Sequence, residues 1–532
     1  MMISSSSCSD LSTSDFSSTS SDTAEQKKRQ KGRKKSSRAV LRLRRKRETV
    51  LNKMDAPRTI SNAKKLPQYV AALSVCLGAV AAGAVLGWTG TISDSLMTGS
   101  LNDIPVDNDV LGWISSFATI GAMITCFPIG MICDAIGRKW ACLITILPFS
   151  LGWFLIIFAT NADMIYAGRF FAGLAGGSFC VAAPLYTSEI AEKEIRGALG
   201  SYFQLLLTIG ILFSYIFGAI TSTQVFSILC CCIPFVFGLV FVFQPETPVY
   251  LLKKGKKDAA LHSLKQLRGP AYDSEAELRE LQQQIDKSEA EKGSFIEALQ
   301  TTAAKKSIFI CFSLMVFQQL SGINAVIFFM SNIFGSAGGN IDPSYSTIGV
   351  GVVQVVATFI SSLVVDKFGR KILLITSALF MSISGALLGV FFTLQGRNIV
   401  EQTTLDKIGF LPIVSLVVFI TAFSLGFGPI PWMASSELMP PEIKSTASSA
   451  AATFNWFLAF VVTRFYNNIV TTIGGDIPFY VFAAIALLGS FFVKFCMPET
   501  KGKSTQEVQD ILNGVKLGNA NGNGVDNPTF KS

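Results

Sequence analysis

Long apolar stretches alternate with short polar ones over residues 65 to 500. The apolar stretches are about 18 to 26 residues long, the length that a helix needs to cross a hydrocarbon layer roughly 30 Å thick. Helices are expected because a backbone that faces lipid has to satisfy its hydrogen bonds internally. The pattern predicts twelve spans, near residues 69–92, 110–132, 140–160, 164–188, 199–220, 223–243, 306–335, 345–365, 371–395, 410–435, 445–468 and 477–497.

The overall composition agrees with a membrane protein. Half of the residues are hydrophobic and 15% are charged, and the mean hydropathy is +0.46. A soluble fold of ordinary proportions could not bury so much apolar surface. We therefore predict an all-α membrane protein with twelve transmembrane helices in two six-helix halves, and with short cytoplasmic helices between the halves.

The charge of the polar stretches alternates in sign along the chain. Residues 27–47 hold thirteen Lys or Arg, and the stretch 244–305 is also basic. Asp occurs without Lys or Arg in the segments 93–109, 161–163, 336–344 and 469–476. Because positive loops stay on the cytoplasmic side, we expect both termini and the central stretch to be cytoplasmic. The segment 396–410 carries both signs and does not follow the rule.

These boundaries divide the chain into five parts. They are a disordered cytoplasmic N-terminal tail (1–64), a first six-helix half (65–250), a cytoplasmic helical linker (251–305), a second six-helix half (306–497) and a cytoplasmic tail (498–532). The first tail is Ser-rich and then polybasic. Two interpretations of residues 27–47 stay open, namely a solvated tail that fixes the topology and a contact with anionic lipid. Nucleic acid is not an expected partner of such a polytopic chain.

The cysteine and histidine residues exclude several classes of site. Eleven Cys occur, nearly all within spans, so no disulfide framework is expected. The single histidine, His262, lies in the central stretch, and no group of His and Cys has metal-ligand spacing. A Gly-rich phosphate loop is also missing from the sequence. We therefore expect no metal, no cofactor, no use of ATP and no enzyme activity.

Three short motifs occur twice, in the same order and at similar separations. The turn at Asp134-Ala-Ile-Gly-Arg-Lys returns 232 residues later at Asp366-Lys-Phe-Gly-Arg-Lys. A Glu seven residues before a basic residue occurs at Glu189 and again at Glu437, and Pro-Glu-Thr begins at Pro245 and at Pro498. Two homologous halves in a membrane chain are typical of secondary transporters, in which the solute site lies between the halves.

The motifs resemble those of one family, the sugar porters of the major facilitator superfamily. The turn Gly130-x3-Asp-x2-Gly-Arg-Lys is similar to the hallmark of the superfamily. Further matches over roughly 65–505 are Arg169, Pro184-x-Tyr-x2-Glu189 with Arg196-Gly, Pro245-Glu-Thr-Pro, Gln318-Gln-Leu-Ser-Gly-Ile-Asn324, Gly428-Pro-Ile-Pro-Trp432, Asn455-Trp456 and Pro498-Glu-Thr-Lys-Gly. The segment from Phe454 to Thr463 further resembles insect facilitated trehalose transporters.

Neutral amides inside the spans are the candidate binding groups. A sugar presents hydroxyls at the edge of its ring and C–H groups on its faces, so amides and an aromatic side chain suit it. An amide is costly in hydrocarbon unless it meets a partner or a wet cavity, and hydrogen bonding between helices is the alternative role. By resemblance, the sugar site is formed by Gln204, Gln318, Gln319, Asn324, Trp432 and Asn455, with Trp456 and Gln354 beside it. Gly426, Gly428, Pro429 and Pro431 are expected to break the tenth span and let it move.

Charged residues at the predicted cytoplasmic ends of the spans are the candidate gate. They are Arg138, Glu189, Arg196, Arg370, Glu437 and Lys444. We expect them to pair across the two halves and to hold the inner side closed while the outer side is open. Anchoring of the topology is the alternative role.

Several positions depart from the glucose-transporter pattern and leave the identity of the sugar open. They are Val249, Phe328, Phe329, Gln354, Ser424 and Lys444. The sequence predicts a facilitative carrier of hexose or trehalose, in the plasma membrane, that works by alternating access. Two alternatives stay open: a proton–sugar symporter, and a transporter-like sugar receptor. Uniport is favoured because no Asp or Glu lies mid-span and because Thr89 stands where proton-coupled relatives carry Asp.

Overall fold

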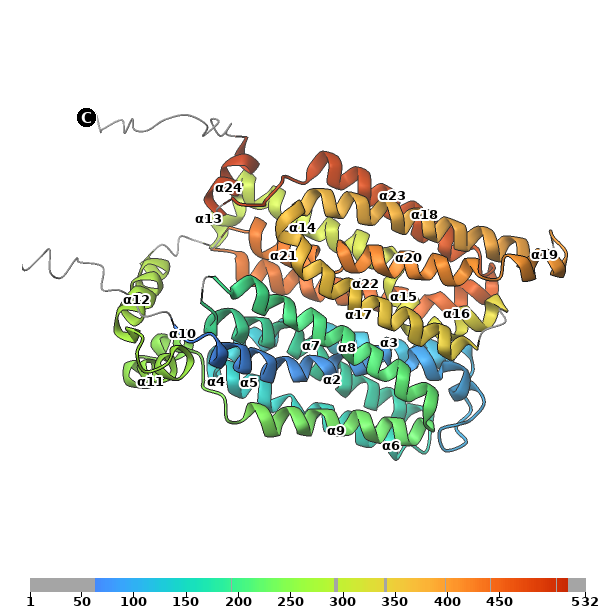
Figure 1. The fold of residues 1–532 in the computed structure, drawn as a ribbon, viewed down its shortest axis with the longest axis horizontal. Coiled ribbons are helices and arrows are strands. Elements are labelled where there is room, and N and C mark those ends of the chain that lie inside the picture. The colour runs from blue at the N-terminus through green and yellow to red at the C-terminus, as the bar shows by residue number, and fades with distance from the viewer. Residues whose placement is uncertain are drawn as a thin grey trace, which may run out of the picture. The chain divides into compact units, whose positions relative to one another are not determined.

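The computed structural model describes residues 63–514, except 193, 291–294, 339–341, 398, 441 and 504. The predicted N-terminal tail up to residue 62, including the polybasic run 27–47, lies outside the described residues. Every regular element within the described part is a helix, and these helices are labelled α2 to α24 in Figure 1. The all-helical prediction is confirmed.

The first six predicted spans appear as eight helices. They are α2 (Leu66–Met97), α3 (Asn108–Thr125), α4 (Pro128–Ile136), α5 (Arg138–Ile144), α6 (Ile146–Ile157), α7 (Ala162–Ile190), α8 (Arg196–Ile220) and α9 (Thr223–Phe241). The pair α3–α4 forms the second span and is bent by 53° at Cys126-Phe127, just before Pro128. Proline is favoured in the first turn of a helix, so Pro128 suits a new start at that point. We call this set of helices the N-half.

The last six predicted spans appear as nine helices. They are α14 (Thr302–Leu320), α15 (Ile323–Phe328), α16 (Met330–Ala337), α17 (Pro343–Phe368), α18 (Arg370–Gly396), α20 (Leu411–Leu425), α21 (Ile430–Leu438), α22 (Lys444–Thr472) and α23 (Ile477–Cys496). A short helix, α19 (Gln402–Lys407), lies between α18 and α20. We call this set the C-half. Its first and fourth spans are broken at glycine-containing segments, Ser321-Gly322 and Gly426–Pro429.

Side chains at the span ends satisfy the first backbone amides of several helices. The Asp107 carboxylate accepts from Val110 N at 2.8 Å, and the Asn161 side chain accepts from Met164 N at 3.0 Å. Thr301 accepts likewise at the start of α14. Such N-caps fill positions that an isolated helix leaves without partners. They explain why these spans begin at short polar segments of the sequence.

Most of the long helices are apolar enough to cross a membrane. Within the described residues, ten helical stretches meet this condition, and the bent pair α3–α4 makes eleven. The other long helix is α22, with 29 residues, which is richer in Ser, Thr and Asn. It packs against α3 and α14, where its polar side chains can meet protein instead of lipid. The twelve predicted spans are therefore all helical, and the chain is a multi-pass membrane protein.

The same packing pattern occurs in both halves. In the N-half the first span packs on the fifth (α2 on α8), the second on the fourth (α3 on α7) and the third on the sixth (α6 on α9). The C-half repeats these pairings as α14 on α22, α17 on α20 and α18 on α23. The sequence repeat therefore corresponds to a repeat of packing.

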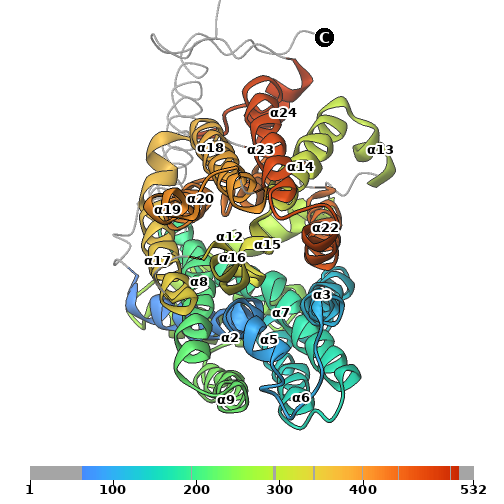
Figure 2. The same ribbon diagram turned by 90° about the vertical axis from the view of Figure 1, so that its right-hand side faces the viewer.

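The two halves meet along helices that are also related by this repeat. The second span of each half packs on the fifth span of the other, as α3 on α22 and α8 on α17. The helices α15 and α16 add a contact with α2. Figure 2 shows α16 beside α2 at the end of the bundle that faces the viewer. The seam between the halves is therefore built from α2, α3 and α8 on one side and α15, α16, α17 and α22 on the other.

Short helices gather at the opposite end of the bundle. They are α10 (Pro248–Lys253), α11 (Lys257–Arg268), α12 (Ser274–Ala290), α13 (Phe295–Gln300) and α24 (Thr505–Asn513). Figure 1 shows them together at its left side. The Arg268 side chain anchors α11 by donating to the Ile190 carbonyl at 2.8 Å and to Glu277. We call this end of the bundle the linker end. The opposite end, at which α2 finishes and α3 begins, is called the far end.

Candidate functional site

Four of the predicted amides form one continuous chain of hydrogen bonds. Asn324 Nδ2 donates to Gln319 Oε1 at 2.5 Å, and Gln319 Nε2 donates to Asn455 Oδ1 at 2.7 Å. Asn455 Nδ2 then donates to Gln318 Oε1 at 2.7 Å. All four side chains are buried. We call this set, Gln318, Gln319, Asn324 and Asn455, the amide chain.

Two helix breaks give the amide chain its position. Gln318 Nε2 donates to the carbonyls of Phe427 and Gly428 at 2.7 and 3.0 Å, in the segment where α20 stops and α21 has not begun. Those carbonyls are available because the helix is interrupted there. Gly322 has a φ of +88°, a backbone conformation that glycine adopts at little cost. The break at Gly322 carries Asn324 onto a separate short helix, beside Gln319.

The two predicted tryptophans lie in a cluster to which both halves contribute. Trp456 is buried and packs with Ala122 and Cys126 of the N-half, and Trp432 packs against the same cluster. The indole Nε1 of Trp456 is buried and has no hydrogen-bond partner. Trp456 also lines a small cavity whose other walls are N-half helices, at Ala82, Ala118, Ala122, Gly173, Gly176, Gly177 and Leu207 among others. An aromatic face and an unused donor are therefore present at the seam.

The remaining two predicted site residues lie outside the hydrogen bonds of the amide chain. Gln354 lies on α17 with its side chain buried and its Oε1 without a hydrogen-bond partner. Gln204 lies on α8, the helix that packs on α17, and is half-buried. An unpaired acceptor in the interior is costly unless a ligand or water meets it. Gln354 thus has unused hydrogen-bonding capacity in this conformation.

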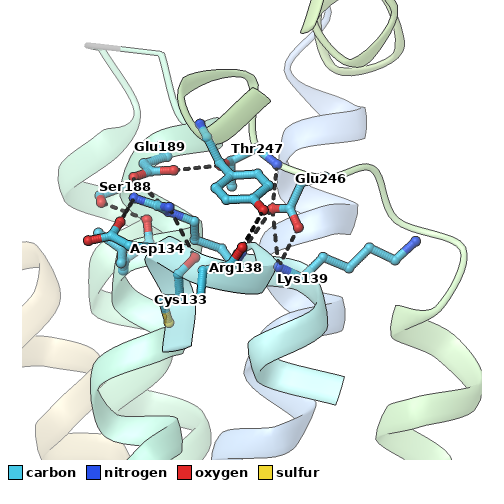
Figure 3. A network of polar contacts seen from close by, with 11 residues as sticks. Cys133, Asp134, Arg138, Lys139, Ser188, Glu189, Glu246 and Thr247 are labelled. Atoms are coloured by element: carbon cyan, nitrogen blue, oxygen red, sulfur yellow. Dashed lines mark hydrogen bonds and ion pairs between the residues drawn. The ribbon is translucent and has the colours of Figure 1, made fainter. Parts of the chain in front are cut away.

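A dense charge network occupies the linker end of the N-half. Arg138 donates Nε to Glu189 Oε1 at 3.0 Å and pairs with Asp134 at 3.0 Å. Figure 3 shows these contacts together with Thr247, whose hydroxyl donates to the other Glu189 oxygen at 2.5 Å. The Glu246 carboxylate accepts from the backbone nitrogens of Arg138 and Lys139, each at 3.1 Å. Together these contacts connect α4, α5, α7 and the segment before α10.

The C-half repeats the arginine–glutamate pair, the threonine contact and the carboxylate cap of this network. Arg370 Nη2 donates to Glu437 Oε1 at 3.0 Å, and the Thr500 hydroxyl donates to Glu437 Oε2 at 2.5 Å. The Glu499 carboxylate accepts from the backbone nitrogens of Arg370 and Lys371 at 3.0 and 3.1 Å. In both halves the carboxylate caps the helix that starts after the turn, where the positive end of the helix dipole attracts an anion.

A glycine with positive φ allows each cap to form. Gly137 and Gly369 have φ values of +103° and +90°. A Cβ on Gly369 would lie 2.7 Å from Glu499 Oε2 and would push the carboxylate away from its capping position, and a Cβ on Gly137 would displace Glu246 in the same way. The glycine of the repeated turn is therefore required both for its backbone conformation and for the approach of the carboxylate.

In this conformation the ion pairs described for two of the gate arginines lie within one half, and the predicted pairing across the halves in the outward-open state stays a prediction. Arg138 pairs with Glu189 and Arg370 pairs with Glu437, each within its own half. The reason is that each turn and the end of the fourth span belong to the same half, so their side chains meet there. Arg196 donates to the Ala191 carbonyl. Lys444 lies within electrostatic range of Glu437 in its own half and of Arg196 in the other, and the interaction with Arg196 is repulsive.

The two capping carboxylates differ in their acidity. Burial raises the pKa of the Glu246 carboxyl above its ordinary value, although the amides of Thr247, Lys139 and Arg138 oppose the shift. Burial acts in the same direction on Glu499, but there the donating amides outweigh it and hold the pKa below its ordinary value. Burial disfavours a charged carboxylate and hydrogen bonds to it favour it. The same motif is therefore electrostatically unequal in the two halves.

A buried arginine lies in the interior of the N-half. Arg169 on α7 donates to the carbonyls of Ile114 and Val85 at 3.1 and 2.7 Å, and its guanidinium lies 5.4 Å from the centre of the Trp88 ring. Its third nitrogen, Nη2, is buried without a hydrogen-bond partner, as is the Thr89 hydroxyl. Within the described part of the chain, no carboxylate forms an ion pair with Arg169.

Sequence reasoning missed the roles of Glu246, Thr247, Glu499 and Thr500. The repeated Pro-Glu-Thr was noted as a mark of duplication but was not placed in the gate. Its recurrence after the Gly-Arg-Lys turn in both halves was the available signal, although the separation differs, with 108 residues from Arg138 to Glu246 and 129 from Arg370 to Glu499. The contacts between the halves at the far end gave no comparable signal, because the residues that form them are not repeated in the sequence.

Comparison with known proteins agrees with the fold and with the motifs. The family model described as sugar (and other) transporter matches residues 30–512. A facilitated trehalose transporter Tret1-2 homolog of Drosophila simulans is 35% identical over 449 residues, which are 84% of this chain and 91% of that protein. The facilitated trehalose transporter Tret1 of Apis mellifera ligustica is 36% identical over 444 residues, 83% of this chain and 87% of that protein.

Solved structures support the same architecture. The xylose transporter XylE from E. coli, in a partially occluded inward open conformation, matches with a TM-score of 0.68 and 23% identity. The match covers 82% of this chain and 99% of that one. At this identity the likeness concerns the fold, which is the twelve-helix major facilitator fold predicted from the sequence. From the extent of the model match and of the curated relatives, the chain belongs to the sugar (and other) transporter family.

Proposed function

We propose that the chain is a facilitative carrier of a small neutral sugar that works by alternating access. The observation that carries the proposal is the amide chain, which lies on broken helices beside the seam between the halves. Its groups are neutral, directional and buried, which suits hydroxyls better than ions. Membership of a family of transporters, with no assembled catalytic group in the described part of the chain, is the reason to propose a carrier and not an enzyme.

In this proposal the sugar exchanges hydrogen bonds with the amide chain. In the described conformation the four amides satisfy one another, so a sugar that enters has to offer equivalent partners. Its hydroxyls both donate and accept, and they can replace an amide at either side. Gln354 Oε1 and Trp456 Nε1 are an acceptor and a donor without partners, and we assign them to hydroxyls that the amide chain does not reach. Gln204 and Trp432 complete the proposed site.

Trehalose and hexoses are the proposed substrates. The two curated relatives described above carry trehalose in their names, and more than four-fifths of this chain aligns with them. Phe328 and Phe329 are both fully buried in the described conformation. They cannot contribute a hydroxyl to a ligand, so we expect polar recognition to come from the amides and not from this aromatic pair.

The proposed topology places the linker end in the cytoplasm. Lys and Arg gather in the segments of that end, and the far end is richer in Asp, in agreement with the positive-inside rule. Both termini are then cytoplasmic, and the plasma membrane is the proposed location. We retain the division of the chain into halves at 65–250 and 306–497 with a linker at 251–305. A contact between residues 27–47 and anionic lipid stays a proposal, and we propose no nucleic-acid partner.

For the gate we propose a revised role. The two charge networks hold the inner ends of each half as separate rigid units, because the ion pairs described for them lie within one half. Arg196 and Lys444, which belong to different halves, repel each other, which favours separation of the halves at the inner side. This arrangement suits a state that is open to the cytoplasm.

Transport without proton coupling is the proposed mode. A symporter needs an intramembrane carboxylate whose charge changes during the cycle, beside a cation that tunes it. Arg169 supplies a buried cation and donates to the Val85 carbonyl, but the residue one turn after Val85 on α2 is Thr89, a hydroxyl where a carboxylate would be required. The sugar then moves only down its own gradient.

Uptake by the purified chain in proteoliposomes tests the proposal. Radiolabelled glucose and trehalose are supplied with and without an imposed pH gradient, and empty liposomes provide the blank. We expect saturable uptake of one or both sugars to the equilibrium level, unchanged by the gradient. Accumulation above equilibrium that requires the gradient would replace uniport by symport. Binding of sugar without flux would favour a receptor. The absence of both binding and flux would overturn the sugar proposal.

A further inference from the structure

Three attractive polar contacts between the halves lie at the far end. Arg464 of α22 pairs with Asp109 of α3, with Nη2 at 2.7 Å from Oδ1. Asn467, one turn later on α22, donates to the Asn108 carbonyl at 3.4 Å. Asn332 of α16 donates to Asp94 of α2 at 2.5 Å. In each of these contacts the N-half provides the acceptor and the C-half provides the donor.

Arg464 combines two interactions with one helix. Its guanidinium lies 4.4 Å from the centre of the Trp113 ring, one turn after Asp109 on α3. A planar guanidinium can bind a carboxylate at its edge while its face covers an indole. The Arg464 side chain is 12% exposed and that of Asp109 is 54% exposed, so the cation is largely removed from water. We call Asp109, Trp113 and Arg464 the outer contact.

The backbones of the two helices also come close at this position. A Cβ on Gly112 would lie 3.2 Å from the Arg464 carbonyl oxygen. A larger residue at 112 would therefore push α3 away from α22, and the glycine allows Arg464 to reach over the Trp113 ring. The outer contact is thus a packed joint between the halves and not a loose pair of surface charges.

We propose that Arg464 is a positioning residue that holds α3 against α22 and so sets how often the carrier opens to the outside. The inference rests on the proposed alternating access and on the proposed topology, in which the far end is extracellular. At the inner side Arg196 and Lys444, which belong to different halves, repel each other. The outer contact therefore supplies an attraction that has to be lost in each cycle before sugar can enter from outside.

The chain offers a matched control at the same end. Arg397 pairs with Asp476 at 3.1 Å, but both residues belong to the C-half. Removing Arg397 therefore breaks an ion pair of the same type and at the same side of the membrane without loosening the seam. A change that follows loss of charge alone would appear in both variants.

A cysteine at Ile327 provides the reporter. Ile327 is buried, and its carbonyl accepts a hydrogen bond from the Tyr215 hydroxyl across the seam at 3.1 Å. Opening of the outer side exposes this position to a membrane-impermeant maleimide added to intact cells. Ser replaces Cys8, Cys232 and Cys496 in the background, and the remaining cysteines are measured as a blank. No sugar is present, so the labelling rate tests the outer contact separately from transport.

We expect Arg464→Ala to raise the labelling rate of the reporter about 5- to 30-fold, from the combined worth of an ion pair and a cation–π contact. Arg464→Lys keeps the charge without the planar stack and should raise it about two- to fivefold. Arg397→Ala should leave the rate unchanged, and the exchange Asp109→Arg with Arg464→Asp should bring it back toward the original value. The ratio of external to internal half-saturation concentrations should fall in Arg464→Ala, which a general loss of stability would not cause.

A second measurement needs no change at Arg464. In the reporter chain the labelling rate should rise as salt is increased to about 1 M, where the Debye length falls to roughly 3 Å. Equal rates in Arg464→Ala and Arg397→Ala would overturn the proposal, as would a reporter rate that salt does not change. If the proposal fails in this way while proteoliposomes still take up sugar, the proposed function stands without the outer contact.

Discussion

Replacing Gln318 by Ala tests the assignment of the amide chain most directly. Gln318 donates to the Phe427 and Gly428 carbonyls at 2.7 and 3.0 Å and accepts from Asn455 at 2.7 Å. It therefore joins the chain of amides to the break between α20 and α21. Alanine removes these three bonds and leaves two buried carbonyls without this donor.

The expected loss can be estimated from these contacts. A neutral hydrogen bond contributes about 0.5–1.5 kcal/mol net, and a buried polar group left unpaired costs about 1–3 kcal/mol. If sugar takes over one or two of these bonds, its binding should weaken by about 1–3 kcal/mol, which is roughly 5- to 150-fold in the dissociation constant. The folded state should lose a similar amount of stability, because the same carbonyls are unpaired without sugar.

The assay combines transport with a stability control. The half-saturation concentration for uptake is measured in proteoliposomes at a temperature well below the unfolding midpoint of the variant. Gln395→Ala is the matched control, because Gln395 also donates to two successive carbonyls at a helix end, those of Ser336 and Ala337 at 3.0 and 3.4 Å, but lies at the far end. It should lose some stability and keep its half-saturation concentration. An unchanged half-saturation concentration in folded Gln318→Ala, or an equal change in both variants, would remove Gln318 from the site.

Three further predictions concern the charged residues. Arg138→Ala should lower the free energy of unfolding by about 3–5 kcal/mol, because it leaves Glu189 buried without its cation. Arg370→Ala should lower it less, since the Arg370 side chain is 11% exposed and that of Arg138 only 2%. Equal losses of stability in thermal unfolding would contradict this reasoning. The pKa of Glu499 is lowered in the folded state, so its contribution to stability is present above the ordinary carboxyl pKa and is lost as pH falls through the folded-state pKa. The pKa of Glu246 is raised, so its contribution to stability is present in acid and is lost as pH rises through the folded-state pKa. At pH 7 Glu499→Gln should therefore destabilise the chain more than Glu246→Gln, and the reverse order of unfolding midpoints would show that the two caps were assigned wrongly. Finally, Thr89→Asp should give Arg169 a carboxylate partner and make uptake respond to an imposed pH gradient, with Thr89→Asn as the neutral control. If the two variants behave identically, position 89 has no role in proton coupling.

Much of the fold follows from local features of the sequence. Length and apolarity are enough to locate spans such as α9 and α23, because lipid on their outer faces demands apolar side chains along the whole segment. The break at Gly426–Pro429 was also expected, since glycine and proline remove the features that keep a helix continuous. The bend at Cys126-Phe127 was not expected, although Pro128 marks it in retrospect. The span α22 was predicted from its apolar stretch at 445–468, although it is richer in Ser, Thr and Asn than the other spans.

The side-chain partners were harder to predict. Gln318, Gln319, Asn324 and Asn455 could be selected because amides are rare within spans, but the order in which they bond depends on how two breaks and α22 meet. Arg138 and Glu189 could be selected as gate residues, yet their pairing within one half depends on which helix ends are adjacent. Sequence separation carries no information on that adjacency. The outer contact could not be found from the sequence, since neither Arg464 nor its partner Asp109 belongs to a motif that is repeated in the two halves.

The repeat itself explains why contacts across the seam decide the preferred state of this carrier. Each half has an equivalent set of helix pairings and an equivalent charge network, so those interactions are retained when one half rotates against the other. They stabilise both end states similarly and cannot favour one of them. The balance then depends on contacts that join the halves at one end only. In this conformation Asp109 and Arg464 attract at the far end, while Arg196 and Lys444 have the same charge at the linker end. A change of about 1.4 kcal/mol in either of these terms alters the ratio of the two states tenfold, so single substitutions at the seam should shift transport kinetics more than equal losses within one half.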